Sequence, residues 1–152
     1  MSLPEYETRP DEKSVLEPEI VSILVSHQLD ILILNGVIDL LIRSKNSDPD
    51  FFLELKVCLE GNGKSPPITS DQWQFLKSIS CGSSFDDRYK ILIYDHSTNL
   101  YALVSGPQVA AGLQEHKPNS TCYISVDCLR GLPWSSPESA ELAILSWCGK
   151  CG

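Results

Sequence analysis

Three charged residues stand in segments that are otherwise apolar. Asp39 lies in "GVIDLLI", and Glu54 and Lys56 lie in "FFLELKV". Side chains alternate between the two faces of a strand, so Glu54 and Lys56 share a face, and Asp39 can meet them if the two strands are neighbours. Carboxylates buried without compensation are costly, so two of them on adjacent strands require a cation beside them. Lys56 supplies one positive charge, and a divalent metal could supply the rest.

These residue types predict metal-assisted chemistry on a phosphate. Carboxylate oxygens suit Mg²⁺ or Mn²⁺, which usually bind through one or two carboxylates and through oxygens of a substrate phosphate. Such a metal lowers the pKa of a bound water and stabilises charge on the phosphate. Lys56 could orient the attacking water or stabilise the developing charge. The spacing leaves one alternative open, which is a cross-strand salt bridge on the solvent face of a sheet.

The elements that must position these residues alternate between helix and strand. The helix before Asp39 begins at Ser14 or Pro18 and ends near Asp30. Asn35-Gly36 predicts a hairpin turn between two strands, and a third strand follows. From its N-terminal end, the sequence predicts a helix to about 30, strands within 30–43 and over 51–57, a loop over 58–70 and a helix over 71–80. It then predicts strands over 89–97 and 100–106, a short helix near 107–115, a strand over 122–129 and a helix over 136–150. This order indicates an α+β (α/β-like) fold with a mixed central sheet flanked by helices.

Length and composition predict one domain. The 152 residues are 42% apolar, enough for a core, and we expect a single domain over 14–152 after a flexible acidic arm over 1–13. The net charge of −8 argues against a protein that merely coats nucleic acid. Half of this charge is local, because residues 1–19 hold six acidic and two basic residues, a net charge of −4. The sequence predicts neither a membrane span nor a secretory signal, so we expect an intracellular protein, cytoplasmic or, in a eukaryote, nuclear.

The segment "IDLLIRSKNSDPDFFLELK" resembles the PD-(D/E)xK nuclease superfamily, with an acid on one strand, a polar turn and Glu-x-Lys on the next strand. With "ITSDQWQFLKSI" it is similar to Holliday-junction-resolvase-like and VRR-NUC-type phage and viral nucleases, and "EPEIVSIL" resembles the opening helix of the resolvases. The resemblance covers about residues 15 to 80. Ile38 stands where the superfamily name has Pro. The fold that this resemblance implies is a restriction-endonuclease-like core.

The resemblance also implies roles for individual residues. Asp39 and Glu54 would be metal-binding carboxylates, the backbone carbonyl of Leu55 a further ligand, and Lys56 the catalytic lysine. Glu17 would be the carboxylate of the opening helix, which assists metal or water binding. Possible substrate contacts are Gln72, Lys64 and Lys77, the last two within a basic surface formed with Arg43, Lys45, Arg88 and Lys90.

The function that follows is metal-dependent hydrolysis of phosphodiester bonds in duplex or branched DNA, with Mg²⁺ or Mn²⁺. We expect a homodimer or a higher even oligomer, because cutting both strands requires two active sites.

Several alternatives remain open. The protein could be a catalytically inactive nuclease-like subunit that binds a protein partner, or an RNA-cleaving enzyme similar to viral cap-snatching endonucleases, with His27 as a metal ligand. Cys122, Cys128, Cys148 and Cys151 could form a four-thiolate zinc site, against the simpler interpretation as reduced packing or terminal residues.

Overall fold

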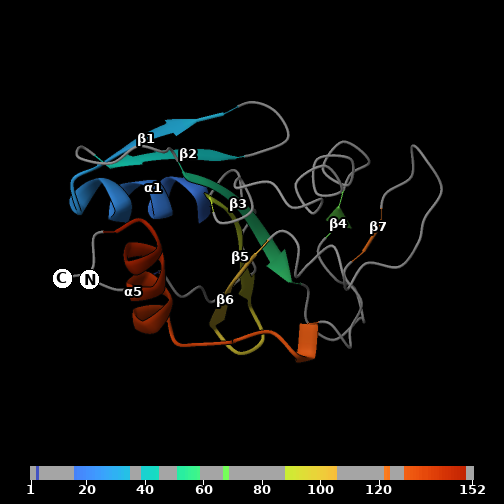
Figure 1. Ribbon diagram of the computed structural model, residues 1–152. Helices are drawn as coiled ribbons and strands as arrows, with labels where there is room; N and C mark the ends of the chain where they lie inside the picture. Colours follow the sequence, from blue (N-terminus) through green and yellow to red (C-terminus); the bar gives the residue numbers. More distant parts are fainter. Residues whose placement is uncertain are drawn as a thin grey trace.

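A five-stranded mixed sheet forms the centre of the computed structural model, which describes residues 3, 16–34, 39–44, 51–58, 67–68, 88–105, 122–123 and 129–149 (Figure 1). The strand order is β1-β2-β3-β5-β6, and a second sheet pairs β4 with β7. The strands are β1 Leu29–Ile33, β2 Leu40–Ser44, β3 Phe51–Cys58, β4 Pro67–Ile68, β5 Tyr89–Asp95, β6 Leu100–Ser105 and β7 Cys122–Tyr123.

The central sheet contains one parallel pair of strands. β1 with β2, β2 with β3, and β5 with β6 are antiparallel, whereas β3 and β5 are parallel. A parallel pair requires a long crossover, and the segment between Cys58 and Tyr89 supplies the length. The predicted mixed sheet with flanking helices is therefore confirmed.

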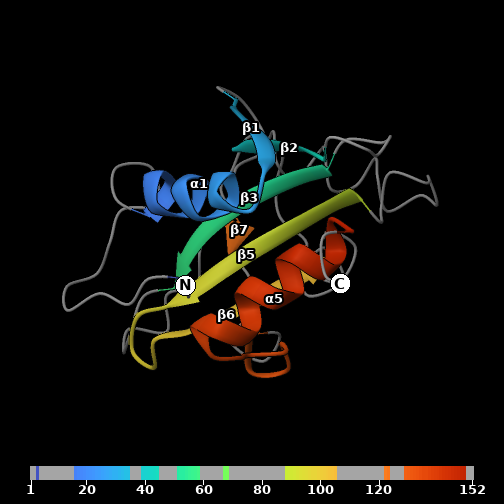
Figure 2. The ribbon, with the colours of Figure 1, turned by 90° about the vertical axis from the view of Figure 1, so that its left-hand side faces the viewer.

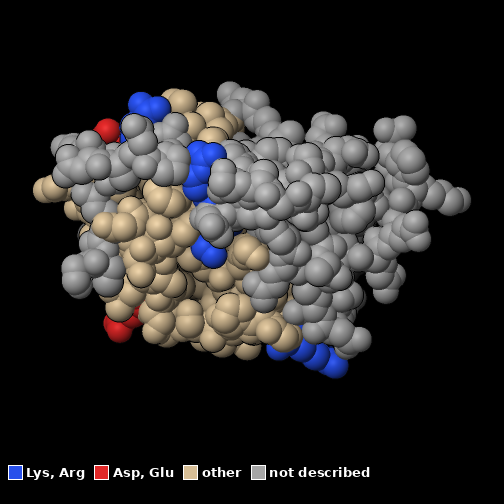
Figure 3. Space-filling model, viewed as in Figure 1, with Lys and Arg blue, Asp and Glu red and all other residues tan. Residues whose placement is uncertain are grey.

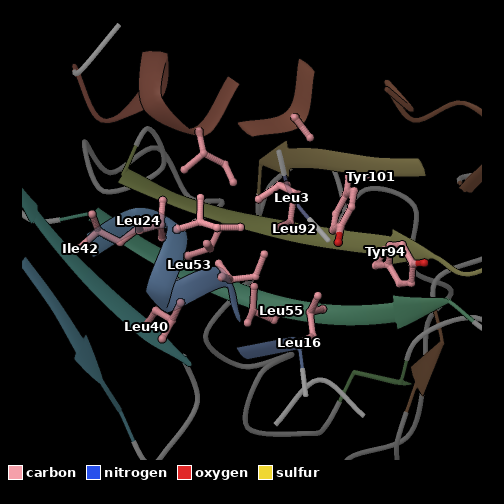
Figure 4. Close-up of a cluster of buried hydrophobic side chains, with 14 of the residues drawn as sticks. Leu3, Leu16, Leu24, Leu40, Ile42, Leu53, Leu55, Leu92, Tyr94 and Tyr101 are labelled. Carbon is pink, nitrogen blue, oxygen red and sulfur yellow. The ribbon is translucent and has the colours of Figure 1, made fainter. Parts of the chain in front are cut away.

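Two helices, α1 Glu17–Ser26 and α5 Pro137–Trp147, lie on the same side of the strands in both ribbon views (Figures 1 and 2). Leu53 and Leu55 of β3 point to this side, where they pack in the core with Leu24 and other apolar side chains (Figure 4). Because side chains alternate along a strand, Glu54 and Lys56 point to the opposite face. The sheet thus has an apolar helix-covered face and a second face that carries the charged residues.

Helix α1 is shorter than predicted. It begins at Glu17 with Pro18 in its first turn, in agreement with the predicted start at Pro18. Ser14, the other predicted start, lies outside the described residues. The predicted end near Asp30 is wrong, because the helix ends at Ser26 and Asp30 belongs to β1. Gln28 has a φ of +63°, a left-handed conformation that the helix cannot continue through.

The segment that carries Asp39 also differs from its prediction. β2 begins at Leu40, so Asp39 directly precedes the strand, and Val37 and Ile38 lie outside the described residues. The third predicted strand and the hairpin of β5 and β6 are confirmed, the latter around a turn in which Asn99 has a φ of +54°.

The C-terminal helix is confirmed with a shorter extent. Ser136 is its N-cap and accepts a hydrogen bond from the Ser139 N–H at 3.2 Å. The helix ends at Trp147, because Gly149 has a φ of +74°.

Five further predictions fall wholly or partly outside the described residues. The helices over 71–80 and 107–115 lie outside them. The segment predicted as a loop over 58–70 contains the short strand β4, and the strand predicted over 122–129 is present as Cys122–Tyr123 but not at Leu129, which is helical. Of the predicted arm, only Leu3 is described, and its side chain is buried in the core. No helix among the described residues is long and apolar enough to cross a membrane.

Gln28 gives a test of the boundary between α1 and β1. Gln28→Gly should raise the free energy of unfolding by up to about 1 kcal/mol, because glycine adopts positive φ without steric penalty. Ser22→Gly, at an exposed position inside α1, is the matched control and should lower it by roughly 0.5 kcal/mol. Urea unfolding measures both, and a destabilising Gln28→Gly would contradict the assigned backbone conformation.

Candidate active site

Asp39 is held at the end of the β2-β3 ladder. The last pair in the register is Leu40 with Leu53, and its continuation by one residue places Asp39 opposite Glu54. The Leu55 N–H donates a hydrogen bond of 2.9 Å to Asp39 Oδ2, and both groups are buried. The aspartate side chain therefore supplies an acceptor for β3 where β2 has no further residue in the ladder. A short polar side chain at this position is what the local geometry requires.

Glu54 and Lys56 lie in the interior of the sheet. Only 3% of Glu54 and 5% of Lys56 are exposed, and Lys56 Nζ is 3.8 Å from Glu54 Oε1. In the parallel register, Glu54 is paired with Ile91 and Lys56 with Ile93, both of them buried. The ion pair thus stands in apolar surroundings, where charge interactions are much stronger than in water.

Tyr89 joins this site from β5. Its side chain is 1% exposed, and burial raises its pKa well above 10. The negative charges of Glu54 and, more weakly, Asp39 raise this pKa further. In the parallel register Tyr89 is paired with Phe52, so it lies on the face of the sheet that carries Glu54. Sequence reasoning missed Tyr89, because only the parallel pairing of β3 with β5 brings it to the site.

The donor set fits a divalent cation. In their ordinary ionised forms, Asp39, Glu54 and Lys56 carry two negative charges and one positive charge, which leaves one negative charge in a buried site. Oxygen donors are those that Mg²⁺ and Mn²⁺ prefer. In a strand, the N–H and C=O of one residue point to the same edge, so the Leu55 carbonyl faces the edge where Asp39 lies.

Glu17 is not brought into a three-ligand group with Asp39 and Glu54. It lies half-buried in the first turn of α1, and Glu19 is exposed. Within the described ranges, no cluster of three or more His, Cys, Asp or Glu side chains could hold a metal ion. The role of Glu17 stays a prediction, as do those of Gln72, Lys64 and Lys77, which lie outside the described residues.

The RNA-cleaving alternative requires His27 to be a metal ligand, but in the structure its side chain pairs with Glu141. Its Nε2 lies 3.3 Å from Oε1 of the buried Glu141, so the pair links the C-terminal end of α1 to α5. These helices cover the face of the sheet opposite Glu54. His27 is thus placed where it joins two helices.

On the face shown in Figure 3, the described basic side chains are not gathered in one patch. Figure 3 shows them in separate groups over the upper strands, the middle and the lower edge of one face. Lys90 Nζ lies 5.9 Å from the centroid of the Trp147 ring, on the helix-covered side of the sheet. Arg43 is exposed and, by alternation, shares the face of Asp39. Lys45, Lys64 and Lys77 lie outside the described residues, so the basic surface stays a prediction.

Cys148 has the properties of a packing residue. It is 1% exposed, and burial raises the pKa of its thiol from about 9 to about 12. Zinc binds thiolates, and a site that favours the neutral thiol disfavours this ligand. The side chains of Cys122, Cys128 and Cys151 are outside the described part of the chain.

Comparison with solved structures places the fold among nucleases. One similar structure is a nuclease from a fusselovirus, with a TM-score of 0.53 and 15% sequence identity, covering 91% of this chain and 90% of that chain. Another is the Holliday junction resolvase of the archaeal hyperthermophile Archaeoglobus fulgidus, with a TM-score of 0.50 and 13% identity, covering 88% and 96%. Comparisons with protein-family models and with curated proteins found no match. The predicted restriction-endonuclease-like fold, and with it the resemblance to PD-(D/E)xK nucleases, is confirmed at the level of the fold.

The pKa of Cys148 gives a pH-dependent test. At pH 9, about half of this thiol is ionised in the unfolded chain, but only about a thousandth in the folded protein. A raised folded pKa favours the neutral thiol, so this contribution to stability is present below pH 9 and is lost as the pH rises toward 12. Iodoacetamide at pH 9 should therefore alkylate Cys148 at least a hundredfold more slowly in native than in urea-unfolded protein, as peptide mass spectrometry measures. Equal rates would contradict its burial.

Proposed function

We propose that this protein is a divalent-metal-dependent endonuclease that hydrolyses phosphodiester bonds in duplex or branched DNA. The observation that carries the proposal is the buried group of Asp39, Glu54 and Lys56, which adjacent chain segments bring together on one face of the sheet. The fold adds support, because one structural neighbour is a viral nuclease and another a Holliday junction resolvase.

Each residue has a role in this proposal. Asp39, Glu54 and the Leu55 carbonyl would hold Mg²⁺ or Mn²⁺, and Glu17 would assist metal or water binding. The metal would supply an activated water and charge neutralisation at the phosphate. Lys56, held beside Glu54, orients the water or stabilises charge on the phosphate oxygens. Gln72, Lys64 and Lys77 would contact the DNA.

A homodimer is the assembly that we propose, with β1 and β2 at the interface. Asp30 and Arg43 are cross-strand partners beside the partners Leu32 and Leu41, and together they line a hollow of about 260 Å³. One acid, one base and two leucines make a self-complementary patch, because a two-fold axis can set each Asp30 against the Arg43 of a second copy. Leu32 is 57% exposed and is available for such a contact. A neutral patch also avoids the repulsion between two chains of net charge −8.

Leu32 tests the assembly. Leu32→Glu should convert a dimer into a monomer at micromolar concentration, because it places two like charges at the centre of the patch. Light scattering after gel filtration measures the mass. Leu142→Glu is the matched control, since Leu142 is also 57% exposed but lies on α5, and it should leave the dimer intact. A monomeric wild-type protein would exclude this interface.

Lys56 tests the catalytic role. Lys56→Ala should lower cleavage of plasmid or four-way junction DNA by orders of magnitude, because the variant keeps both carboxylates and loses the cation that acts at the phosphate. Cleavage is measured with Mg²⁺, with Mn²⁺ and with EDTA, and circular dichroism checks the fold. Persistent cleavage by Lys56→Ala would exclude Lys56 from the chemistry.

Asp39 separates the enzyme from the inactive-subunit and salt-bridge alternatives. Asp39→Asn keeps an oxygen that can accept the Leu55 N–H bond, but it weakens metal binding, so cleavage should be abolished. Metal-free stability should be unchanged or raised, because the repulsion with Glu54 is relieved. An inactive subunit predicts no wild-type cleavage and no rise of the melting temperature with Mg²⁺ or Mn²⁺. A buried salt bridge with no catalytic role predicts that Lys56→Ala and Asp39→Asn each lower the free energy of unfolding.

A further inference from the structure

We infer that Leu34 is a positioning residue of this site, whose backbone N–H fixes the main chain of Asp39 so that the carboxylate is presented to the metal. The inference rests on the proposed metal-binding role of Asp39. It concerns a residue outside the nuclease motif, because Leu34 precedes the segment "IDLLIRSKNSDPDFFLELK" in the chain.

Asp39 accepts hydrogen bonds from two sides. The Leu34 N–H donates to the Asp39 carbonyl at 2.8 Å, and the Leu55 N–H donates to Asp39 Oδ2 at 2.9 Å. The first bond holds the main chain of Asp39, and the second holds its side chain. Leu34 directly follows β1, and Leu55 belongs to β3. Asp39 is therefore held between the two segments that flank β2 in the sheet.

The bond from Leu34 matters because Asp39 lies before its own strand. β2 begins at Leu40, and the ladder between β2 and β3 ends at the pair of Leu40 with Leu53. That ladder therefore does not reach the main chain of Asp39. The ladder between β1 and β2 ends with Ile33 opposite Leu40, and the Leu34 bond continues it by one residue. This continuation fixes the point at which the Asp39 side chain leaves the backbone.

The strand that leads to this donor is itself anchored. Leu29, at the opposite end of β1, is 2% exposed and belongs to the same core cluster as Leu24 of α1. β1 follows α1 and lies beside β2 in both ribbon views, and the two strands are paired along the whole of Leu29–Ile33 (Figures 1 and 2). The core thus fixes β1, and β1 fixes Asp39 through Leu34.

This arrangement has a functional consequence. The ligands of a metal must be held within about 0.5 Å of their binding geometry by the groups behind them. Loss of a hydrogen bond that orients a ligand typically lowers metal affinity about 10–100-fold. Because Leu34 acts on the backbone of Asp39 and not on its carboxylate, we expect an effect at the lower end of this range.

Ile33 and Leu34 provide a matched pair of substitutions. Hydrogen bonds between antiparallel strands alternate along each strand, so the N–H of Leu34 points to β2 and that of Ile33 points to the outer edge of β1. β1 is an edge strand of the central sheet, and an edge strand tolerates proline where the N–H points outward. Ile33→Pro therefore leaves the bonds between β1 and β2 in place, whereas Leu34→Pro removes the donor to Asp39. Leu34→Val keeps this donor and has the same number of side-chain carbon atoms as proline.

The experiment titrates Mn²⁺ into the full-length, metal-free protein and follows free Mn²⁺ by electron paramagnetic resonance. We expect Leu34→Pro to bind Mn²⁺ about tenfold more weakly than wild type, and Leu34→Val and Ile33→Pro to bind it as wild type does. Equal affinities of Leu34→Pro and wild type would overturn the inference while leaving the proposed function intact, and so would an equal loss in Leu34→Pro and Ile33→Pro. A wild-type protein that binds no Mn²⁺ would overturn both.

Amide hydrogen exchange, followed by NMR, supplies a second measurement that does not depend on the folding of Leu34→Pro. It compares wild type with Asp39→Ala, both without metal. We expect the Leu34 and Leu55 amides to exchange slowly in wild type. Asp39→Ala keeps the backbone carbonyl and loses the carboxylate, so exchange should become faster at Leu55 and stay slow at Leu34. Exchange of the wild-type Leu34 amide at the rate of an unfolded chain would overturn the inference.

Discussion

The burial of Asp39, Glu54 and Lys56 within the central sheet is the constraint on which the rest of the structure depends. These residues are 3%, 3% and 5% exposed, and burial of unpaired charges would cost several kcal/mol for each ion. The fold offsets part of this cost with local partners. The Leu55 N–H holds Asp39 at 2.9 Å, and Lys56 stands 3.8 Å from Glu54. A sheet of this kind tolerates two acids inside it because its own backbone and one lysine are directed at them.

The opposite face of the same strand stabilises this arrangement. Leu53, Leu55 and Val57 alternate with the charged residues and pack into the core beneath α1 and α5. Parallel pairing with β5 then covers the far edge of β3 with buried apolar residues such as Ile91 and Ile93. The position of the charged residues is therefore set by apolar packing that has no part in the chemistry. Disruption of that packing would move Glu54 and Lys56 even though their own contacts were unchanged.

The sequence predicted the parts of this site that depend on short-range pattern. Alternation along "FFLELKV" predicted that Glu54 and Lys56 share one face, and the helix predicted over 136–150 starts at Ser136, the N-cap of α5. The sequence-based predictions failed at boundaries of helices and strands that depend on the conformation of a single residue. Gln28 adopts a left-handed conformation that glutamine seldom takes, and the ladder stops at Leu40, so Asp39 lies before its strand. Tyr89 could not be predicted, because nothing in "YKILIYD" shows that this strand lies parallel to β3.

The central claim is that Asp39 and Glu54 are ligands of one divalent metal. A crystal of the protein soaked in Mn²⁺ and measured at a wavelength where manganese scatters anomalously tests it most directly. The account predicts an anomalous peak between these two carboxylates, at roughly 2.0–2.3 Å from an oxygen of each, with the Leu55 carbonyl on the same side. An anomalous peak at another position would contradict the claim. Crystals saturated with Mn²⁺ in which Asp39 and Glu54 contact only protein groups would also contradict it.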